Sequence, residues 1–323
     1  MNVLITCCGR KVYLINEVRK ALHKLFPKEK HRVYVSDSSE LSPSFHYADA
    51  GLIVPSISDP HYIKNILSFC TRYKISLLIP SKDTEIKKYA EHRAEFSGVV
   101  IPIPSLDLVK IFEDKYLFYK TLSNIVQTPS TFLLHKKKHH LAFPYIIKER
   151  GVNIETSGFF TCYDKHDEHY ASKKLIEPIA QEKIDGLEYT VDALFDSESK
   201  PIVVIPRRRV RIRANVSDIG LVEKDPLLIK KSIEIAQFLR ISGPCNLQWI
   251  RNNKGEDYLL EINPRISGGL QMTLAACPDF ILALIKVAIG QKTKKLSYKN
   301  SVLTMKYDET VSLHLNINKK IEL

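Results

Sequence analysis

The sequence lacks any long apolar run. None of the apolar segments in its 323 residues approaches the roughly 20 residues that a helix needs to cross a membrane. A signal-peptide core is missing too, because residues 3–6 have the pattern of a short strand near the N-terminus. We therefore expect a cytoplasmic chain that has no membrane partner.

Cysteine motifs are also absent. Cys7 and Cys8 are adjacent, but the six cysteines include no CxxC pair and none has a histidine at metal-ligand spacing. This argues against zinc and thiol-exchange sites and favours reduced, mostly buried thiols. No Ser-His-Asp or Cys-His arrangement indicates a covalent nucleophile either.

Glycine is scarce where a dinucleotide-binding loop needs it. The turn after the first strand contains only Gly9 and has no GxGxxG motif. Asp37 ends the second strand, where such folds hold ribose, but without the glycine loop a nicotinamide site is not indicated. We expect the crevice at the carboxyl ends of these strands to hold part of another substrate.

The net charge of +12 raises nucleic acid as a partner. The lysines are spread along the chain, however, and runs such as 136–138 and 292–295 are typical of solvated loops. A basic surface that steers small anionic substrates inward explains the charge equally well. We expect no nucleic-acid partner.

Strand and helix signals alternate over residues 1–105. Strands are expected at 3–6, 33–37, 51–54, 77–80 and 99–103, and helices at 12–25, 62–73 and 83–96. This order predicts a small doubly wound parallel α/β domain. The chain is long enough, and its 44% hydrophobic content high enough, for two or three cores.

The pattern changes after Leu106. A helix containing Asp114 and Lys115 comes first, and a later apolar strand ends at Lys148, before the loop 150–158. A lysine there can neutralise phosphate while loop amides cover it. The alternative is an edge strand that its lysine protects from pairing. Farther on, residues 179–184 can line a flat base with apolar side chains and backbone groups.

Three oxygen-bearing side chains occupy two strands that a turn separates. Residues 243–250 are apolar and β-rich, 252–255 give a turn signal, and 257–262 alternate again, so a hairpin is predicted. Glu261 and Asn263 then share one face, and Gln248 can lie across from them. Mg²⁺ prefers such hard oxygen ligands. The alternative is a polar hairpin edge without a metal.

An arginine-rich segment follows Pro206. If it is a strand, Arg207, Arg209, Arg211 and Arg213 share one face and would repel one another unless anions lie between them. We expect this face to close over a triphosphate and an acidic acceptor, with Arg211 or Arg213 nearest. Replacing Arg211 by Ala should raise KM or abolish turnover. The alternative is a solvated edge strand or loop.

These pieces, in this order, resemble the ATP-grasp superfamily, most closely the branch with the carbamoyl phosphate synthetase large subunit and small-molecule carboxylate-amine ligases. The resemblance covers nearly the whole chain. It implies an α/β (α+β ATP-grasp) fold with three parts: an N-terminal α/β domain at 1–108, a linker helix and lid at 109–182, and a C-terminal antiparallel grasp domain at 183–323.

The resemblance also implies roles for single residues. Lys115 and Lys148 match the lysines that contact ATP phosphates, and Arg265 matches the arginine beside the acyl phosphate. The hinge that receives adenine corresponds to Glu182, Lys183 and Ile184, and the acidic ribose-side position to Glu188. The ligands of Mg²⁺, or of Mn²⁺ as an alternative metal, correspond to Gln248, Glu261 and Asn263. The lid loop departs from the pattern, because it has only Gly151 and Gly158 where relatives are often rich in glycine.

The activity implied is an ATP-dependent ligase that activates a small-molecule carboxylate as an acyl phosphate and couples it to an amine. A kinase-like enzyme, or a carbamoyl-phosphate-synthetase-like enzyme that uses bicarbonate, is the alternative. A non-catalytic nucleotide-binding or nucleic-acid-binding protein is a third candidate, which the three oxygen ligands disfavour. The identity of the acid and the amine is not encoded in a recognisable pattern, and a homodimer is left open.

Overall fold

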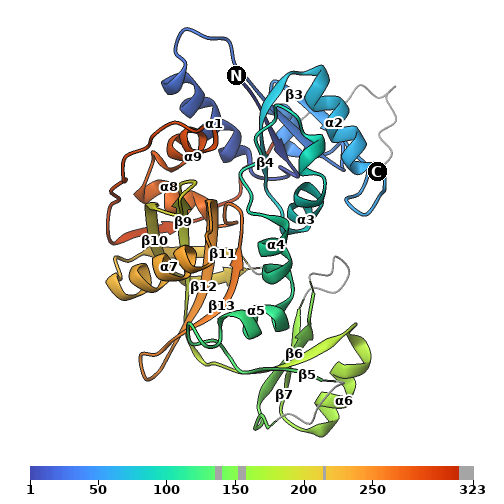
Figure 1. The fold of residues 1–323 in the computed structure, drawn as a ribbon, viewed down its shortest axis with the longest axis vertical. Helices are drawn as coiled ribbons and strands as arrows, with labels where there is room; N and C mark the ends of the chain where they lie inside the picture. Colours follow the sequence, from blue (N-terminus) through green and yellow to red (C-terminus); the bar gives the residue numbers. More distant parts are fainter. Residues whose placement is uncertain (135–139, 152–157, 214–215, 313–323) are drawn as a thin grey trace.

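The computed structural model describes residues 1–134, 140–151, 158–213 and 216–312. Within these ranges the strands form two four-stranded sheets and one six-stranded sheet. Figure 1 shows the six-stranded sheet in the middle of the molecule, with the parallel sheet at one end of the long axis and the small antiparallel sheet at the other. This mixed α/β architecture confirms the predicted fold class.

The N-terminal unit is a parallel sheet with the strand order β3-β2-β1-β4. Its elements are β1 (Asn2–Thr6), α1 (Val12–Leu25), β2 (Arg32–Asp37), the 3-10 turn η1 (Pro43–His46), β3 (Ala50–Ile53), α2 (Tyr62–Arg72), β4 (Ile75–Pro80), α3 (Asp83–Glu91) and the 3-10 turn η2 (Arg93–Glu95). Side chains alternate across β1, so that Val3 and Ile5 pack against α1 while Leu4 packs with α2 and α3. Residues 99–103, expected as a strand, form only one parallel bridge, between Leu77 and Val100.

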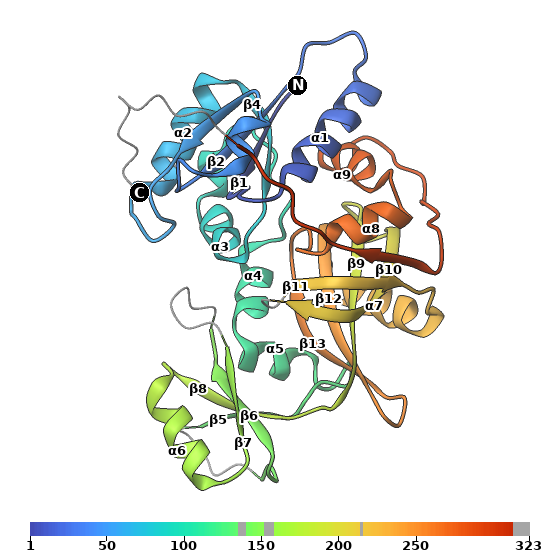
Figure 2. The same cartoon turned by 180° about the vertical axis from the view of Figure 1, so that it is seen from behind.

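Two short helices link this unit to the small antiparallel sheet, which is the expected lid. The single helix expected around Asp114 is divided into α4 (Leu106–Glu113) and α5 (Lys115–Leu122). Asp114 is extended, and its carboxylate accepts 3.0 Å hydrogen bonds from the amides of Tyr116 and Leu117, so it is the N-cap of α5. Phe118 packs into the core under the six-stranded sheet. Figure 2 shows both helices running from the N-terminal unit towards the small sheet.

The small sheet has the order β5-β8-β6-β7 and is antiparallel throughout. It consists of β5 (Thr131–Leu133), β6 (Tyr145–Glu149), β7 (Phe159–Cys162) and β8 (Pro178–Glu182), with α6 (Lys165–Lys174) between β7 and β8. Ala171 of α6 packs on Tyr145 and Ile147, which are two residues apart and therefore on the same face of β6. The predicted loop 150–158 lies mostly outside the described residues, as do Lys136 to Lys138.

The six-stranded sheet has the order β13-β12-β9-β10-β11-β14. Its strands are β9 (Gly186–Phe195), β10 (Pro201–Arg213), β11 (Val216–Val222), β12 (Gly243–Asn252), β13 (Asp257–Asn263) and β14 (Val302–Met305), and its helices are α7 (Pro226–Phe238), α8 (Leu270–Ala276) and α9 (Phe280–Ala288). In β9, Val191 and Ala193 pack towards α7, while Asp192 lies on the other face and contacts Thr273 of α8. Polar groups of β9 therefore face α8 and the N-terminal unit.

A shared core joins the N-terminal unit to the six-stranded sheet. Val3 and Leu14 belong to the same buried cluster as Ile205 of β10 and Leu284 of α9. Both views show α1 beside α9 (Figures 1 and 2). Within the described ranges no single helix is long and apolar enough to span a membrane; α8 and α9 meet that criterion only together, as a pair bent by 105°.

Candidate active site

The β12–β13 hairpin brings the predicted metal ligands together. Gln248 lies opposite Glu261, and Asn246 lies opposite Asn263. The Asn263 amide nitrogen donates to Glu261 Oε1 at 2.9 Å and to Asn246 Oδ1 at 3.2 Å, which turns the Asn263 side chain along the hairpin. The hairpin itself is as predicted from the sequence.

The chemistry of these donors suits Mg²⁺. Glu261 offers a carboxylate, and Gln248 and Asn263 offer amide oxygens, so the set is hard and carries one negative charge. Among the described residues there is no group of three His, Cys, Asp or Glu side chains that could hold a metal ion. A cation at this hairpin therefore needs further oxygens from a bound anion such as a phosphate.

Arg209 of β10 lies against this set. Its Nη1 donates to Gln248 Oε1 at 3.0 Å and to Glu188 Oε2 at 2.8 Å. Burial lowers the pKa of Arg209, and the Glu188 carboxylate opposes that shift. A guanidinium this close to a predicted metal ligand is suited to binding an anion.

Lys115 and Lys148 approach the hairpin from the lid side. Burial lowers the pKa of Lys148 to about 8; the Glu261 carboxylate raises it and Lys115 lowers it further. Burial also lowers the pKa of Lys115, again opposed by Glu261. Lys115 Nζ donates to the carbonyl of Gly151 at 2.9 Å. The two cations and the Glu261 carboxylate thus act on one another.

The predicted adenine hinge lies where the chain passes from β8 to β9. Glu182 pairs with Ser130 through its backbone amide (2.9 Å) and its carboxylate (3.1 Å), which fixes the end of β8. Lys183 forms an ion pair with Asp185, and Ile184 is half-buried between them. Glu188 follows in β9 beside Arg209. The hinge side chains are therefore largely engaged, which leaves backbone groups for a base.

Arg265 follows β13 and reaches the N-terminal unit. Its guanidinium forms an ion pair with Asp83 at the start of α3, and Nη1 donates to the carbonyl of Ile266 at 2.8 Å. Its Nε is buried without a partner among the described residues. Arg265 thereby lies at the contact between the two larger units.

The first part of the arginine-rich segment is interior, because β10 pairs with both β9 and β11 up to Arg208. From Arg209 onwards β10 pairs with β11 alone. The edge-strand alternative is therefore wrong for Arg207 and Arg208, but it describes the exposed end of the strand at Arg211 and Arg213. Register shifts between Arg209 and Arg211 and again after Arg211 break the expected alternation. Arg207 is 1% exposed and pairs with Asp192 at 3.4 Å, whereas Arg211 is 62% exposed and pairs with Asp218.

A pocket of about 360 Å³ lies between the N-terminal unit and this face of the sheet. Its lining includes Arg207 and Arg209 but not Arg211 or Arg213, so the structure favours the first pair and the roles of the second stay predictions. The N-terminal unit contributes Lys11, Ser81, Lys82, Asp83 and Thr84 to the lining. The six-stranded sheet and its loops contribute Thr190, Arg207, Arg209, Val216, Ser217, Asn246, Gln248, Arg265, Ser267, Gly268 and Gly269. Lys11 and Ser81 follow β1 and β4, so the crevice expected at these strand ends does contribute to the pocket.

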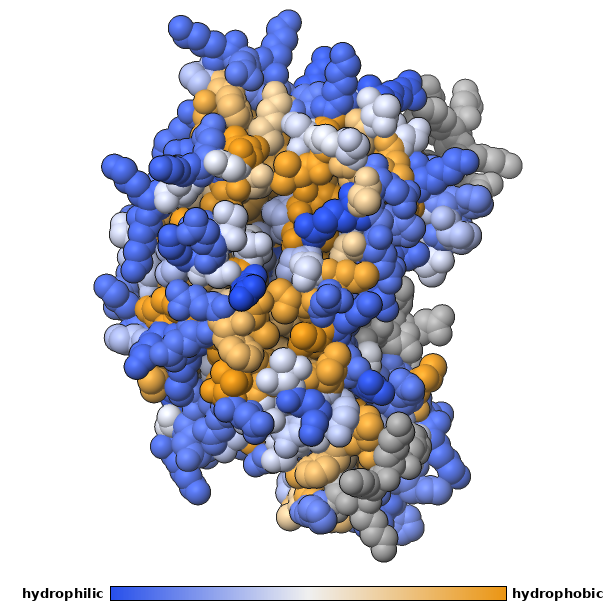
Figure 3. All heavy atoms as spheres, viewed as in Figure 1, coloured by the Kyte–Doolittle hydropathy of each residue, from blue (hydrophilic) through white to orange (hydrophobic). Residues whose placement is uncertain are grey.

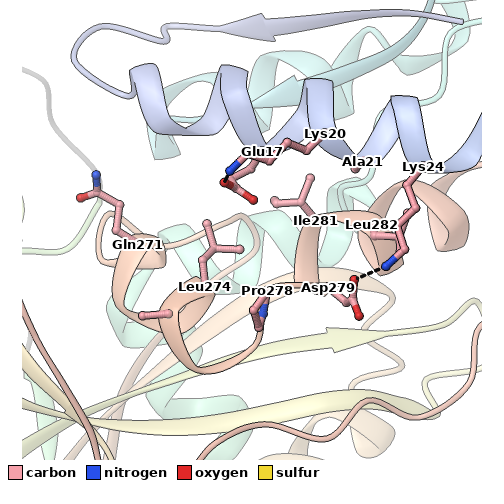
Figure 4. Close-up of a pocket in the computed structure, with 11 residues that line it drawn as sticks. Glu17, Lys20, Ala21, Lys24, Gln271, Leu274, Pro278, Asp279, Ile281 and Leu282 are labelled. Atoms are coloured by element: carbon pink, nitrogen blue, oxygen red, sulfur yellow. Dashed lines mark hydrogen bonds and ion pairs between the residues drawn. The ribbon is translucent and has the colours of Figure 1, made fainter. Parts of the chain in front are cut away.

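A second pocket, of about 470 Å³, lies between α1 and the α8–α9 turn (Figure 4). Its charged side chains are already paired, Lys20 with Glu17 at 2.6 Å and Lys24 with Asp279 at 2.9 Å, and the remaining lining is mainly apolar. Figure 3, viewed as in Figure 1, shows hydrophilic side chains over most of the periphery of the molecule and apolar ones gathered towards its middle. The 360 Å³ pocket is therefore the better candidate for anionic substrates.

Two parts of the chain match known protein families. Residues 175–311 match the family described as ATP-grasp in the biosynthetic pathway with Ter operon. Residues 3–103 match the PylC-like N-terminal domain. Every residue that lines the 360 Å³ pocket lies within one of the two matched segments.

The carbamoyl phosphate synthase large chain of Thermoanaerobacter sp. (strain X514) is 28% identical over 230 residues, which cover 64% of this chain and 21% of that protein. The chain thus spans about a fifth of the length of the curated relatives it matches. In fold it is similar to the biotin carboxylase domain of the Hydrogenobacter thermophilus 2-oxoglutarate carboxylase, solved with MgADP and bicarbonate (TM-score 0.74, 14% identity, 92% of this chain and 72% of that one). It is also similar to an L-amino acid ligase from Bacillus licheniformis (TM-score 0.71, 13% identity, 90% and 75%).

Proposed function

Because this chain belongs to the ATP-grasp superfamily, we propose that it is an ATP- and Mg²⁺-dependent ligase. It activates a small-molecule carboxylate as an acyl phosphate and joins it to an amine, with release of ADP and phosphate. The observation that carries the proposal is that the carboxylate of Glu261, which lies opposite Gln248 in the hairpin, raises the pKa of both Lys115 and Lys148 against the effect of burial.

The chain's own residues supply positioning and charge. A carboxylate is a poor acyl donor because its oxygen does not leave; once its oxygen attacks the γ-phosphorus and ADP departs, the acyl carbon carries a phosphate leaving group. Lys115 and Lys148 neutralise charge on the phosphates, and Arg209 and Arg265 hold the reacting carboxylate and the transferred phosphoryl group. The amine then attacks the acyl carbon, loses a proton, and phosphate leaves.

Mg²⁺ would be held by Glu261, Asn263 and Gln248. When bound, it supplies Lewis-acid neutralisation of the phosphate oxygens. The hinge between β8 and β9 would receive adenine through backbone groups, since Glu182 and Lys183 are engaged with Ser130 and Asp185.

The second candidate is an enzyme that acts on bicarbonate or stops at a phosphorylated product. The match to carbamoyl phosphate synthase favours it, although the chain covers only about a fifth of that protein. ADP release that requires an acid and an amine together supports the ligase, whereas ADP release with acid or bicarbonate alone supports the second candidate.

The experiment is a screen of acid and amine mixtures for ADP release in the presence of Mg²⁺, followed by the mass of the product. Calorimetric binding of ADP with and without Mg²⁺ tests the nucleotide site independently of any substrate. If the protein binds neither ADP nor ATP in either condition, the proposal is wrong.

A further inference from the structure

The 360 Å³ pocket has more positive charge than its own carboxylates balance. Its lining contains five basic side chains and one acidic one, Asp83. The three arginines have carboxylate partners: Arg207 pairs with Asp192, Arg209 with Glu188 and Arg265 with Asp83. Lys11 and Lys82 form no ion pair with any residue that the structure describes. The excess charge therefore comes mainly from the side of the N-terminal unit.

Lys11 is held in place although it lacks a counterion. Its Nζ lies 3.2 Å from Ser81 Oγ, which itself lies 2.8 Å from the carbonyl oxygens of Thr6 and Cys7. Burial and the nearby Arg265 lower its pKa, and the buried Glu85 carboxylate, which forms no ion pair with it, partly opposes that shift. Lys11 is also the N-cap of α1, a helix of 14 residues, and makes no capping bond through its side chain. An anion at Lys11 would relieve this local excess of positive charge.

Lys306 does not line the pocket itself, but it contacts Gly268, which does. It follows β14, and its Nζ donates to the carbonyl of Gly268 at 2.8 Å. Burial lowers its pKa, Arg207 and Lys11 lower it as well, and the Asp218 carboxylate opposes the shift, so Lys306 is close enough to both cations to be repelled by them. Like charges are brought together at such a cost chiefly where an anion binds between them.

The turn after Arg265 offers uncharged donors to the same place. Ser267 is 4% exposed, lines the pocket, and its hydroxyl has no hydrogen-bond partner among the described residues. At Gly269 a Cβ would lie 2.5 Å from the Arg207 guanidinium, so only glycine lets the chain pass this close to the cation. A buried hydroxyl without a partner costs free energy unless a ligand satisfies it.

We propose that the acid accepted by this protein carries a second acidic group, a carboxylate or a phosphate, which binds at Lys11, Lys306 and Ser267. The group that is activated lies instead beside Arg209 and Arg265, near the metal hairpin. This inference rests on the proposed function and names its substrate class. An amine in the same position would be repelled by Lys11 and Lys306, so the basic end of the pocket belongs to the acid.

The test compares acids that differ in the second group. The protein is titrated separately with inorganic phosphate, glutarate and 3-phosphoglycerate, and for comparison with glutarate monoamide and glycerate, which lack the second acidic group. Binding is followed by the rise in Tm at saturating MgADP. The variants are Lys11→Met, Lys11→Arg, which keeps the charge, and the control Lys64→Met, an exposed lysine on α2 that lines neither pocket.

We expect the wild type and Lys64→Met to bind the acids with a second acidic group about tenfold or more tightly than their counterparts with a single carboxylate. Lys11→Arg should keep part of this preference. Lys11→Met loses this preference while it still binds MgADP. Glutarate and 3-phosphoglycerate in separate titrations distinguish a carboxylate from a phosphate as the second group. If Lys11→Met binds every anion as the wild type does, or if the two classes of acid bind equally well to the wild type, the inference is wrong. If the wild type does not bind MgADP at all, it is instead the proposed function that is wrong.

Discussion

Arg209 donates a 3.0 Å hydrogen bond to the side-chain oxygen of Gln248, one of the residues expected to hold the metal. A guanidinium and a divalent cation on the same oxygen repel each other. The site is therefore best filled by metal and polyphosphate together, since the phosphate oxygens lie between the two positive charges and attract both. Metal alone should bind weakly.

Replacing Arg209 by Met should separate metal binding from catalysis. Without nucleotide, Mn²⁺ should bind more tightly to the variant, because the positive charge beside Gln248 is gone. Turnover should nevertheless fall by about 10²–10³-fold, as is typical when a donor to a developing oxyanion is removed. Mn²⁺ binding is measured by electron paramagnetic resonance, and kcat by ADP release.

Arg211→Met is the matched comparison, since Arg211 lies on the same strand but is exposed and paired with Asp218. The sequence predicted a loss of activity on substitution of Arg211, whereas the pocket lining favours Arg209. A larger loss of kcat in Arg211→Met than in Arg209→Met would return the role to Arg211.

Glu261→Gln should remove the effect of Mg²⁺ on nucleotide affinity. The substitution keeps the shape of the side chain but removes the only carboxylate among the three proposed ligands, so MgADP should bind about tenfold or more weakly while metal-free ADP binds at least as well. Calorimetry with and without Mg²⁺ measures both. Glu234→Gln, on the exposed face of α7, is the control. An unchanged Mg²⁺ effect in Glu261→Gln would rule out this hairpin as the metal site.

Nucleotide binding should weaken as the pH rises through about 8. Burial and Lys115 lower the pKa of Lys148 to about 8, against the pull of Glu261, so the folded protein loses this positive charge well below the ordinary lysine range. The protonated form binds phosphate; hence the affinity for ADP, measured without divalent cations, should fall by up to about tenfold per pH unit above 8. The comparison starts at pH 7, because the terminal phosphate of ADP itself gains a proton at lower pH.

Lys148→Arg provides the comparison, because arginine stays protonated throughout this range. Its affinity for ADP should vary less with pH than that of the wild type, with a residual dependence from Lys115, whose pKa is also lowered by burial. Equal slopes in the two proteins would show that Lys148 does not titrate in the binding step.

The hairpin and the closeness of Gln248, Glu261 and Asn263 were predictable because they depend on local rules, whereas their role as metal ligands stays a prediction. Alternation at period two and a strong turn signal fix which residues lie opposite each other, and the structure pairs Gln248 with Glu261 accordingly. The break before α5 was also within reach of the sequence, since Asp114 is a favoured N-cap residue, although a continuous helix was expected there.

The rest depends on relationships that a sequence does not display. The register shifts around Arg211 come from the pairing of β10 with β11, and Arg207 and Arg209 line the pocket whereas Arg211 and Arg213 do not. Likewise, Lys11 and Ser81 reach the pocket only because the N-terminal unit packs on the six-stranded sheet through a shared core. Nothing in the local pattern around residue 11 indicates that contact.

Asp114 couples the linker helix to the lid, and its substitution should affect nucleotide binding as well as stability. Its carboxylate caps α5 and also binds Arg150, with contacts of 2.9 Å to Nε and 2.6 Å to Nη2, while the next residue, Lys115, donates to the carbonyls of Arg150 and Gly151. Asp114→Ala should therefore lower the free energy of unfolding by about 1–2 kcal/mol and also weaken ADP binding.

Asp225 offers a control of the same construction, because it caps α7 through two backbone amides and pairs with Arg251 at 2.7 Å, away from the lid. Urea unfolding should give similar losses of stability for Asp114→Ala and Asp225→Ala, whereas calorimetry should detect weaker ADP binding in Asp114→Ala alone. If both variants bind ADP equally well, Asp114 serves only as a helix cap, and the position of Lys115 does not depend on its contact with the lid.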